Sequence, residues 1–111
     1  MISKPMNSIK LVVLYRVEPG CLGPDGAQYI TEFCQFAQPL VAAHTPSFME
    51  WQLQPRFDKK LPEMQCQLAG KNLSTEQAER YFALQGVTAD DLEEQLNFQL
   101  THLIDQYFGR W

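Results

Sequence analysis

Residues 47–68 read SFMEWQLQPRFDKKLPEMQCQL, and this stretch decides the fold. Apolar and polar side chains alternate over 49–54 and again over 63–68, with a segment between them that begins and ends in proline. Alternation with a period of two is typical of strands that are buried on one face and solvated on the other. We therefore expect two neighbouring antiparallel strands, joined as a hairpin by residues 55–62.

The two faces of this predicted hairpin differ in chemistry. One face carries apolar and sulfur-containing side chains, namely Met49, Trp51, Leu53, Met64, Cys66 and Leu68. The other face carries side chains that exchange hydrogen bonds with polar groups, namely Glu50, Gln52, Gln54, Glu63, Gln65 and Gln67. The apolar face should meet a layer of helices. The polar face is either the wet side of a one-sided sheet or a surface for a polar ligand or peptide.

The segments around the hairpin predict one more strand and three helices. Residues 9–17, IKLVVLYRV, are apolar on both alternating faces, which is typical of a strand that is central or covered on both sides. A helix should begin at Asp25, with Gln28 as its capping partner. At Pro39 it should either kink or stop, with a short extra turn that ends near His44. Ser74 and Thr88 are the expected N-caps of two further helices.

The order of the predicted elements is therefore β-α-β-β-α-α. A strand, a crossover helix and a second strand imply a parallel pair, and the hairpin adds an antiparallel third strand. We expect one α+β domain over residues 1–111, with a small three-stranded mixed sheet and helices packed mainly on one face. Residues 1–8 should form a flexible N-terminal segment.

Composition and charge narrow the class of protein. The 111 residues are 45% hydrophobic and 20% charged, which is typical of a folded globular chain. A net charge of −4 disfavours nucleic acid, and the basic residues Arg56, Lys59, Lys60 and Lys71 form only a short cluster. No signal peptide or membrane span is evident, and three cysteines cannot all pair, so a small soluble cytosolic protein with reduced thiols is expected.

The loop EPGCLGPDG, residues 18–26, is either a corner of the chain or a site. Its glycines do not have the spacing of a phosphate-binding loop, and its acids and prolines oppose an anion. Cys21 lies before a predicted helix, where free amides can stabilise a thiolate. Cys21 is therefore the candidate catalytic residue, while the alternative is a small apolar side chain that fills a turn.

The same loop has a partial resemblance to the thioredoxin-like family. CLGPD after a strand, Thr45-Pro46 before the next strand, and LSTEQAERYF at a helix start are similar in order to that pattern. The resemblance implies a redox role for Cys21 and a cis-proline role for Pro46. The second cysteine of the family motif is missing here, and proline does not directly follow the cysteine and glycine.

Metal and cofactor sites are not indicated by the sequence. The cysteines and histidines lack the spacing of metal ligands, and the acids at 90–94 fit the first turn of a helix. We expect no metal and no cofactor. His44 should lie far from Cys21, and His102 should be a solvated histidine near acids unless the last helix docks beside the loop.

Aromatic residues of the last helix are the candidate partner-binding residues. Phe98 and His102 lie off the apolar stripe of that helix, and Phe108 and Trp111 end the chain. Exposed aromatic groups would favour association, and so would the first strand if it lay at the edge of the sheet. The leading hypothesis is an interaction or binding module without catalytic machinery, forming a homodimer or binding a protein partner. The alternative is a thiol-dependent redox protein or enzyme centred on Cys21.

Overall fold

The first strand lies at the centre of a four-stranded sheet whose order is β2-β1-β3-β4. The structure is a computed structural model that describes residues 10–109. Its elements are β1 (Leu11–Val17), the 3-10 helix η1 (Pro19–Leu22), α2 (Gly26–Ala42), β2 (Met49–Pro55), β3 (Met64–Leu68), β4 (Lys71–Asn72), α3 (Thr75–Leu84) and α4 (Ala89–Tyr107). The α+β class and the single domain are as expected, while residues 1–8 lie outside the described part.

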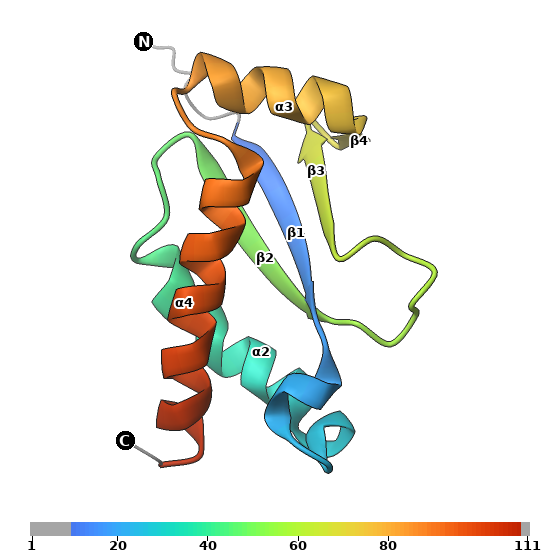
Figure 1. Cartoon of the computed structure of the whole chain (residues 1–111), viewed down its shortest axis with the longest axis vertical. Helices are drawn as coiled ribbons and strands as arrows, with labels where there is room; N and C mark the ends of the chain where they lie inside the picture. The colour runs from blue at the N-terminus through green and yellow to red at the C-terminus, as the bar shows by residue number, and fades with distance from the viewer. Residues whose placement is uncertain (1–9, 110–111) are drawn as a thin grey trace, which may run out of the picture.

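The predicted hairpin of β2 with β3 is wrong, because β1 lies between the two strands (Figure 1). β1 pairs in parallel with β2, as Val13 opposite Trp51, and antiparallel with β3, as Val13 opposite Cys66. The physical reason lies in β1 itself. A strand that is apolar on both faces is most stable in the centre of a sheet, so the connection between β2 and β3 passes the end of β1.

The sheet has four strands rather than three because β3 turns back into β4. The two strands pair antiparallel, with Leu68 opposite Lys71. Ala69 and Gly70 between them have positive φ values of 53° and 81°. Two consecutive residues with positive φ match the tight turn that suits the twist of a hairpin. The short polar segment after Leu68 gave no alternation from which this strand could be predicted.

The core lies between one face of the sheet and the helices α2 and α4, which pack against each other (Figure 1). Leu11, Val13, Tyr15 and Val17 present their side chains to this core, and each is at most 5% exposed. The helices and flanking strands add Ile30, Phe33, Ala37, Val41, Met49, Trp51, Leu92, Leu96 and Leu100, among others. The alternation of the strands therefore meets a helical layer, as predicted.

The helix ends test the predicted caps. Ser74 and Gln77 form the complete capping box, and the Thr88 hydroxyl accepts a hydrogen bond from the Asp91 amide, so both of these caps are confirmed. The Asp25 side chain makes no capping bond, although Asp25 is the N-cap residue of α2. α2 also continues through Pro39 to Ala42, rather than stopping near that proline. Within residues 10–109, no helix combines the length and the hydropathy needed to cross a membrane.

Candidate functional site

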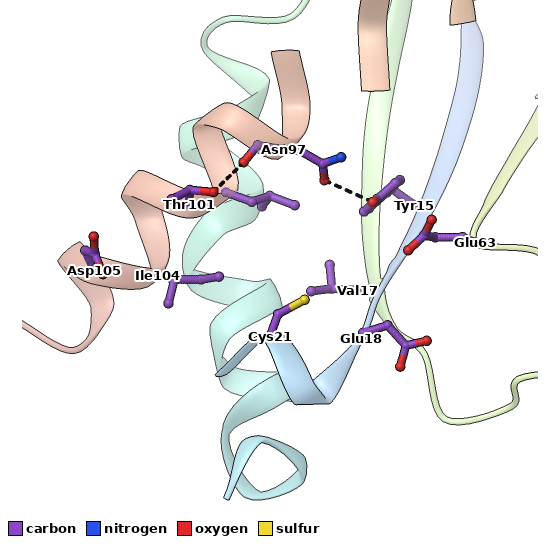
Figure 2. Close-up of a pocket in the computed structure, with 10 residues that line it drawn as sticks. Tyr15, Val17, Glu18, Cys21, Glu63, Asn97, Thr101, Ile104 and Asp105 are labelled. Atoms are coloured by element: carbon purple, nitrogen blue, oxygen red, sulfur yellow. Dashed lines mark hydrogen bonds between the residues drawn. The ribbon is translucent and has the colours of Figure 1, made fainter. Parts of the chain in front are cut away.

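A cleft of about 450 Å³ opens between β1, η1, the segment before β3, and α4 (Figure 2). Its size falls in the range that holds small organic molecules in proteins. The lining is mixed in chemistry, with apolar, hydroxyl, thiol, amide and carboxylate groups. The lining residues are Tyr15, Val17, Glu18, Cys21, Glu63, Asn97, Leu100, Thr101, Ile104 and Asp105.

The secondary structure explains why these side chains meet. Tyr15 and Val17 are two residues apart on β1 and therefore lie on the same, helix-facing side of the strand. On α4 the lining positions 97, 100, 101 and 104 recur at intervals of three and four residues, so they share one face of the helix. The cleft is thus the gap between the end of β1 and the second half of α4, and η1 closes one end of it (Figure 2).

The loop over residues 18–26 is both a corner of the chain and a wall of this cleft. Its centre is the 3-10 helix, and Gly23 has a φ of 97°, which favours glycine. Gly26 is buried against Pro19: a Cβ added to Gly26 would lie 1.7 Å from the Pro19 carbonyl oxygen. The glycine therefore lets η1 fold back onto the start of α2, and this fold places Cys21 at the cleft.

Tyr15 provides a buried phenol at the inner end of the cleft. Tyr15 is 5% exposed, and its hydroxyl donates a hydrogen bond of 3.1 Å to Asn97 Oδ1 (Figure 2). Burial, followed by the nearby charges of Glu63 and Glu93, raises the pKa of Tyr15 to about 12. The phenol is therefore protonated at neutral pH, and it remains a hydrogen-bond donor.

Carboxylates supply the charge of the site. Figure 2 shows the Glu63 carboxylate directed towards Tyr15. Burial raises the pKa of the nearby Glu93 carboxyl, and the charges of Glu63 and Asp90 and a hydrogen bond with Glu63 raise it further. This crowding of carboxyl groups indicates that the region between β1 and α4 has a negative potential.

The predicted basic cluster is partly neutralised by the same loop. Arg56 Nη1 lies 2.6 Å from one Glu18 carboxylate oxygen, and Lys59 Nζ lies 3.7 Å from the other. Arg56 also donates to the backbone carbonyls of Lys59 and Leu61. The charge of Glu18 and two of the cluster's cations are therefore used to hold the connection between β2 and β3 in place.

Cys21 lines the cleft, but its environment disfavours the thiolate. Burial raises the pKa of the Cys21 thiol, and the charges of Glu18 and Glu63 raise it further. A catalytic thiol usually has its pKa lowered by positive charge or free amides. His44 and His102 do not line this cleft, so the cleft offers Cys21 no histidine that could act as a general base. Pro46, which the thioredoxin-like resemblance assigned to a cis bond, has a trans peptide bond.

The predicted partner-binding residues divide between different places. Phe98 is 67% exposed, and its ring stacks edge-on against His102 with centroids 4.7 Å apart. Both line a second groove of about 310 Å³, together with Leu40 of α2 and His44 in the turn after α2. Phe108 instead packs against the ring of Tyr29 at the edge of the core. Trp111 lies outside the described residues.

The polar face of the sheet is organised by an arginine. Arg16, which is 8% exposed, lies on this face and donates hydrogen bonds to the Pro62 carbonyl and to Gln65 Oε1. Glu63, which was predicted to lie on the polar face of the sheet, lines the cleft instead. Sequence reasoning also missed Asn97 and Thr101, which are exposed polar positions that gain a role only when α4 is placed against β1.

Among residues 10–109 no group of three or more histidine, cysteine or acidic side chains is arranged to hold a metal ion. Comparisons of the chain with family models, with curated proteins and with solved structures found no match.

Proposed function

We propose that this protein is a small binding module without catalytic machinery, and that its cleft binds a small organic cation with an apolar part. The observation that carries the proposal is the combination of an apolar wall with a carboxylate at one opening. Val17, Leu100 and Ile104 provide apolar surface, while Glu63 provides an acceptor that is directed inwards (Figure 2). Pockets for small molecules typically combine apolar walls with a few convergent polar groups.

The charge of the site favours a cation over an anion. Burial raises the pKa of Glu93, and Glu63 lies close enough for its charge to raise this pKa further. A bound ammonium group would offset this repulsion, whereas a bound carboxylate would increase it. The hydroxyls of Tyr15 and Thr101 and the amide of Asn97 also line the cleft and can orient the polar end of the ligand.

Thiol chemistry at Cys21 is the less favoured alternative. The pKa of this thiol is raised rather than lowered, so the thiol is a poor nucleophile at neutral pH. In the binding proposal the sulfur is simply a polarizable part of the cleft wall. The three cysteines are all free, which supports a reducing compartment such as the cytosol as the proposed location.

Two probes of equal shape and opposite charge test the proposal. 2-Phenylethylammonium and 3-phenylpropionate each carry a phenyl ring on a two-carbon linker to the charged group. We expect the ammonium to raise the melting temperature and to broaden or shift the amide signals of Asn97 and Thr101, while the carboxylate has no effect. Equal effects of both probes, or effects of neither, would contradict the proposal.

Substitution of Glu63 shows whether binding occurs at this cleft. E63Q should weaken ammonium binding by about tenfold, which corresponds to about 1.4 kcal/mol. The matched control is E50Q, because Glu50 is an exposed carboxylate on β2 that does not line the cleft. Equal affinities of the wild type and E63Q would place the ligand elsewhere.

Self-association is a second candidate function, favoured by the exposure of Phe98. If two α4 helices met antiparallel with Phe98 on the two-fold axis, His102 of one copy would lie opposite Glu94 of the other, since both are four residues from Phe98. The expected result is a light-scattering mass near twice 12.8 kDa that F98S returns to 12.8 kDa. L84S is the matched control, because Leu84 is 85% exposed on α3. A monomeric wild type would contradict this candidate.

A further inference from the structure

Within residues 10–109, β2 is an edge strand, and no strand of this part of the chain pairs with its outer backbone groups. Such an edge is a template for pairing with another chain, and natural proteins protect it. β2 pairs with β1 on its inner side along its whole length, from Leu11 opposite Met49 to Val17 opposite Pro55. The groups that need protection are therefore the amides and carbonyls that point away from β1.

A side chain of α2 occupies the middle of this edge. Gln38 Nε2 donates to the Trp51 carbonyl oxygen at 2.6 Å, and the Leu53 amide donates to Gln38 Oε1 at 2.8 Å. The two backbone groups belong to the residues on either side of Gln52. Both hydrogen bonds are short, and both are made by one carboxamide from a helix that packs against β2.

This pair of hydrogen bonds is the pair that one residue of a parallel strand would make. In a parallel ladder a residue donates its N–H to the carbonyl of one residue and accepts from the amide two positions further along the same neighbour. Gln38 makes the same two bonds with Trp51 and Leu53. Its carboxamide therefore supplies the donor and the acceptor that the N–H and C=O of one residue in a neighbouring strand would supply.

We propose that Gln38 holds the outer edge of β2 closed, and that this edge pairs with β2 of a second copy when the Gln38 side chain is removed. Antiparallel pairing about Gln52 is compatible with the charges of the strand. In that register Glu50, the only charged residue of β2, faces Gln54 of the other copy and not a second Glu50. Gln52 faces Gln52 of the second copy, and the two side-chain amides can donate to and accept from each other.

Q38L tests the proposal, because leucine removes both hydrogen bonds and suits a helix. The matched control is Q35L, since Gln35 is exposed on the same helix and has no side-chain hydrogen bond to β2. Amide exchange at low protein concentration is the first readout. We expect the Leu53 amide of the wild type to exchange slowly, and Q38L, but not Q35L, to accelerate its exchange by about tenfold or more.

Light-scattering mass against concentration is the second readout. We expect Q38L to exceed the mass of the wild type at the same concentration, and Q35L to match the wild type. Fast exchange of Leu53 in the wild type would show that Gln38 does not close the edge. Opening of the edge without any increase in mass would overturn the proposed pairing.

Q38E provides a variant in case Q38L does not fold. It replaces the donor to the Trp51 carbonyl with a carboxylate oxygen, and the two facing oxygens repel each other, so the side chain should leave the edge and the Leu53 amide should exchange faster. Since Gln38 does not line the cleft, binding of the ammonium probe should be unchanged in these variants. The two proposals can therefore fail independently.

Discussion

The buried Gly26 lies so close to Pro19 that a Cβ on the glycine would be 1.7 Å from the Pro19 carbonyl oxygen and 2.6 Å from the carbonyl carbon. Both atoms belong to the backbone, so they cannot move aside as a flexible side chain can. The wall of the cleft that contains Cys21 therefore depends on the absence of a side chain at residue 26.

G26A should destabilise the protein by about 1–3 kcal/mol, because backbone must shift to make room for the methyl group. Denaturant unfolding measures the change. G20A is the matched control, since nothing lies within 4 Å of a Cβ at Gly20. Its stability should stay within about 0.5 kcal/mol of the wild type. Equal stability of G26A and G20A would show that η1 does not pack on α2 in this way.

The phenol of Tyr15 should titrate far above a free tyrosine. Its pKa is raised from 10.0 to about 12, chiefly by burial. A pKa raised in the folded state favours folding below the unfolded value of about 10, and this stabilisation is lost as the pH rises towards 12. In alkaline absorbance titrations, the difference between the wild type and Y15F should have its midpoint near 12. A midpoint near 10 would contradict the buried position of the hydroxyl.

The capping box of α3 gives a prediction about stability. The Ser74 hydroxyl accepts from the Gln77 amide at 3.1 Å, and the Gln77 side chain accepts from the Ser74 amide at 2.9 Å. S74A should therefore lower the free energy of unfolding by about 1 kcal/mol. S47A, at an exposed serine outside the helices and strands, is the control. If both variants unfold at the same denaturant concentration, the capping box contributes nothing measurable.

These caps show which features of the fold were predictable. The caps at Ser74 and Thr88 each join residues three positions apart, and the alternation of the strands has a period of two. The local sequence therefore contains all that is needed to predict both features. The order of the strands does not arise locally. Alternation assigns each side chain to a face, but it does not choose the neighbouring strand. β1 lies between β2 and β3, as is typical of a strand that is apolar on both faces. Val12 and Leu14 on its second face were the sequence signal for this central position.

The cleft illustrates the same limit. Cys21 could be singled out because the loop that contains it is one continuous stretch of sequence, and Cys21 does line the cleft. The Tyr15–Asn97 hydrogen bond joins residues 82 positions apart. No pattern in either segment indicates this contact, because it depends on how α4 lies against β1. The pairing of Glu63 with Glu93 was hidden for the same reason.

Glu93 should make stability depend on pH in the acidic range. Its pKa is raised by burial and by the charges of Glu63 and Asp90, so protonation favours the folded state. This stabilisation is present below the unfolded value of about 4.5 and is lost as the pH rises through the raised pKa. At neutral pH E93Q should therefore melt at a higher temperature than the wild type, and the advantage should fade at acidic pH.

E94Q is the control for this experiment, because Glu94 is exposed on the next position of the same helix. It removes the same charge from the first half of α4 without removing the contact with Glu63. An equal gain from E94Q and E93Q would mean that the net charge of the helix, and not the carboxyl pair, determines the effect.

Cys21 should react slowly with iodoacetamide at neutral pH, since burial and the charges of Glu18 and Glu63 raise its pKa above the usual value of 9.0. It should still react before Cys34 and Cys66, which are buried and whose pKa values are raised to about 11 by burial. E63Q should speed the labelling of Cys21, because it removes one of the charges that oppose the thiolate, whereas E50Q should leave the rate unchanged. Mass spectrometry of the alkylated peptides measures all three rates. Rapid labelling of Cys21 at neutral pH, at a rate unaffected by E63Q, would instead support the thiol-dependent alternative.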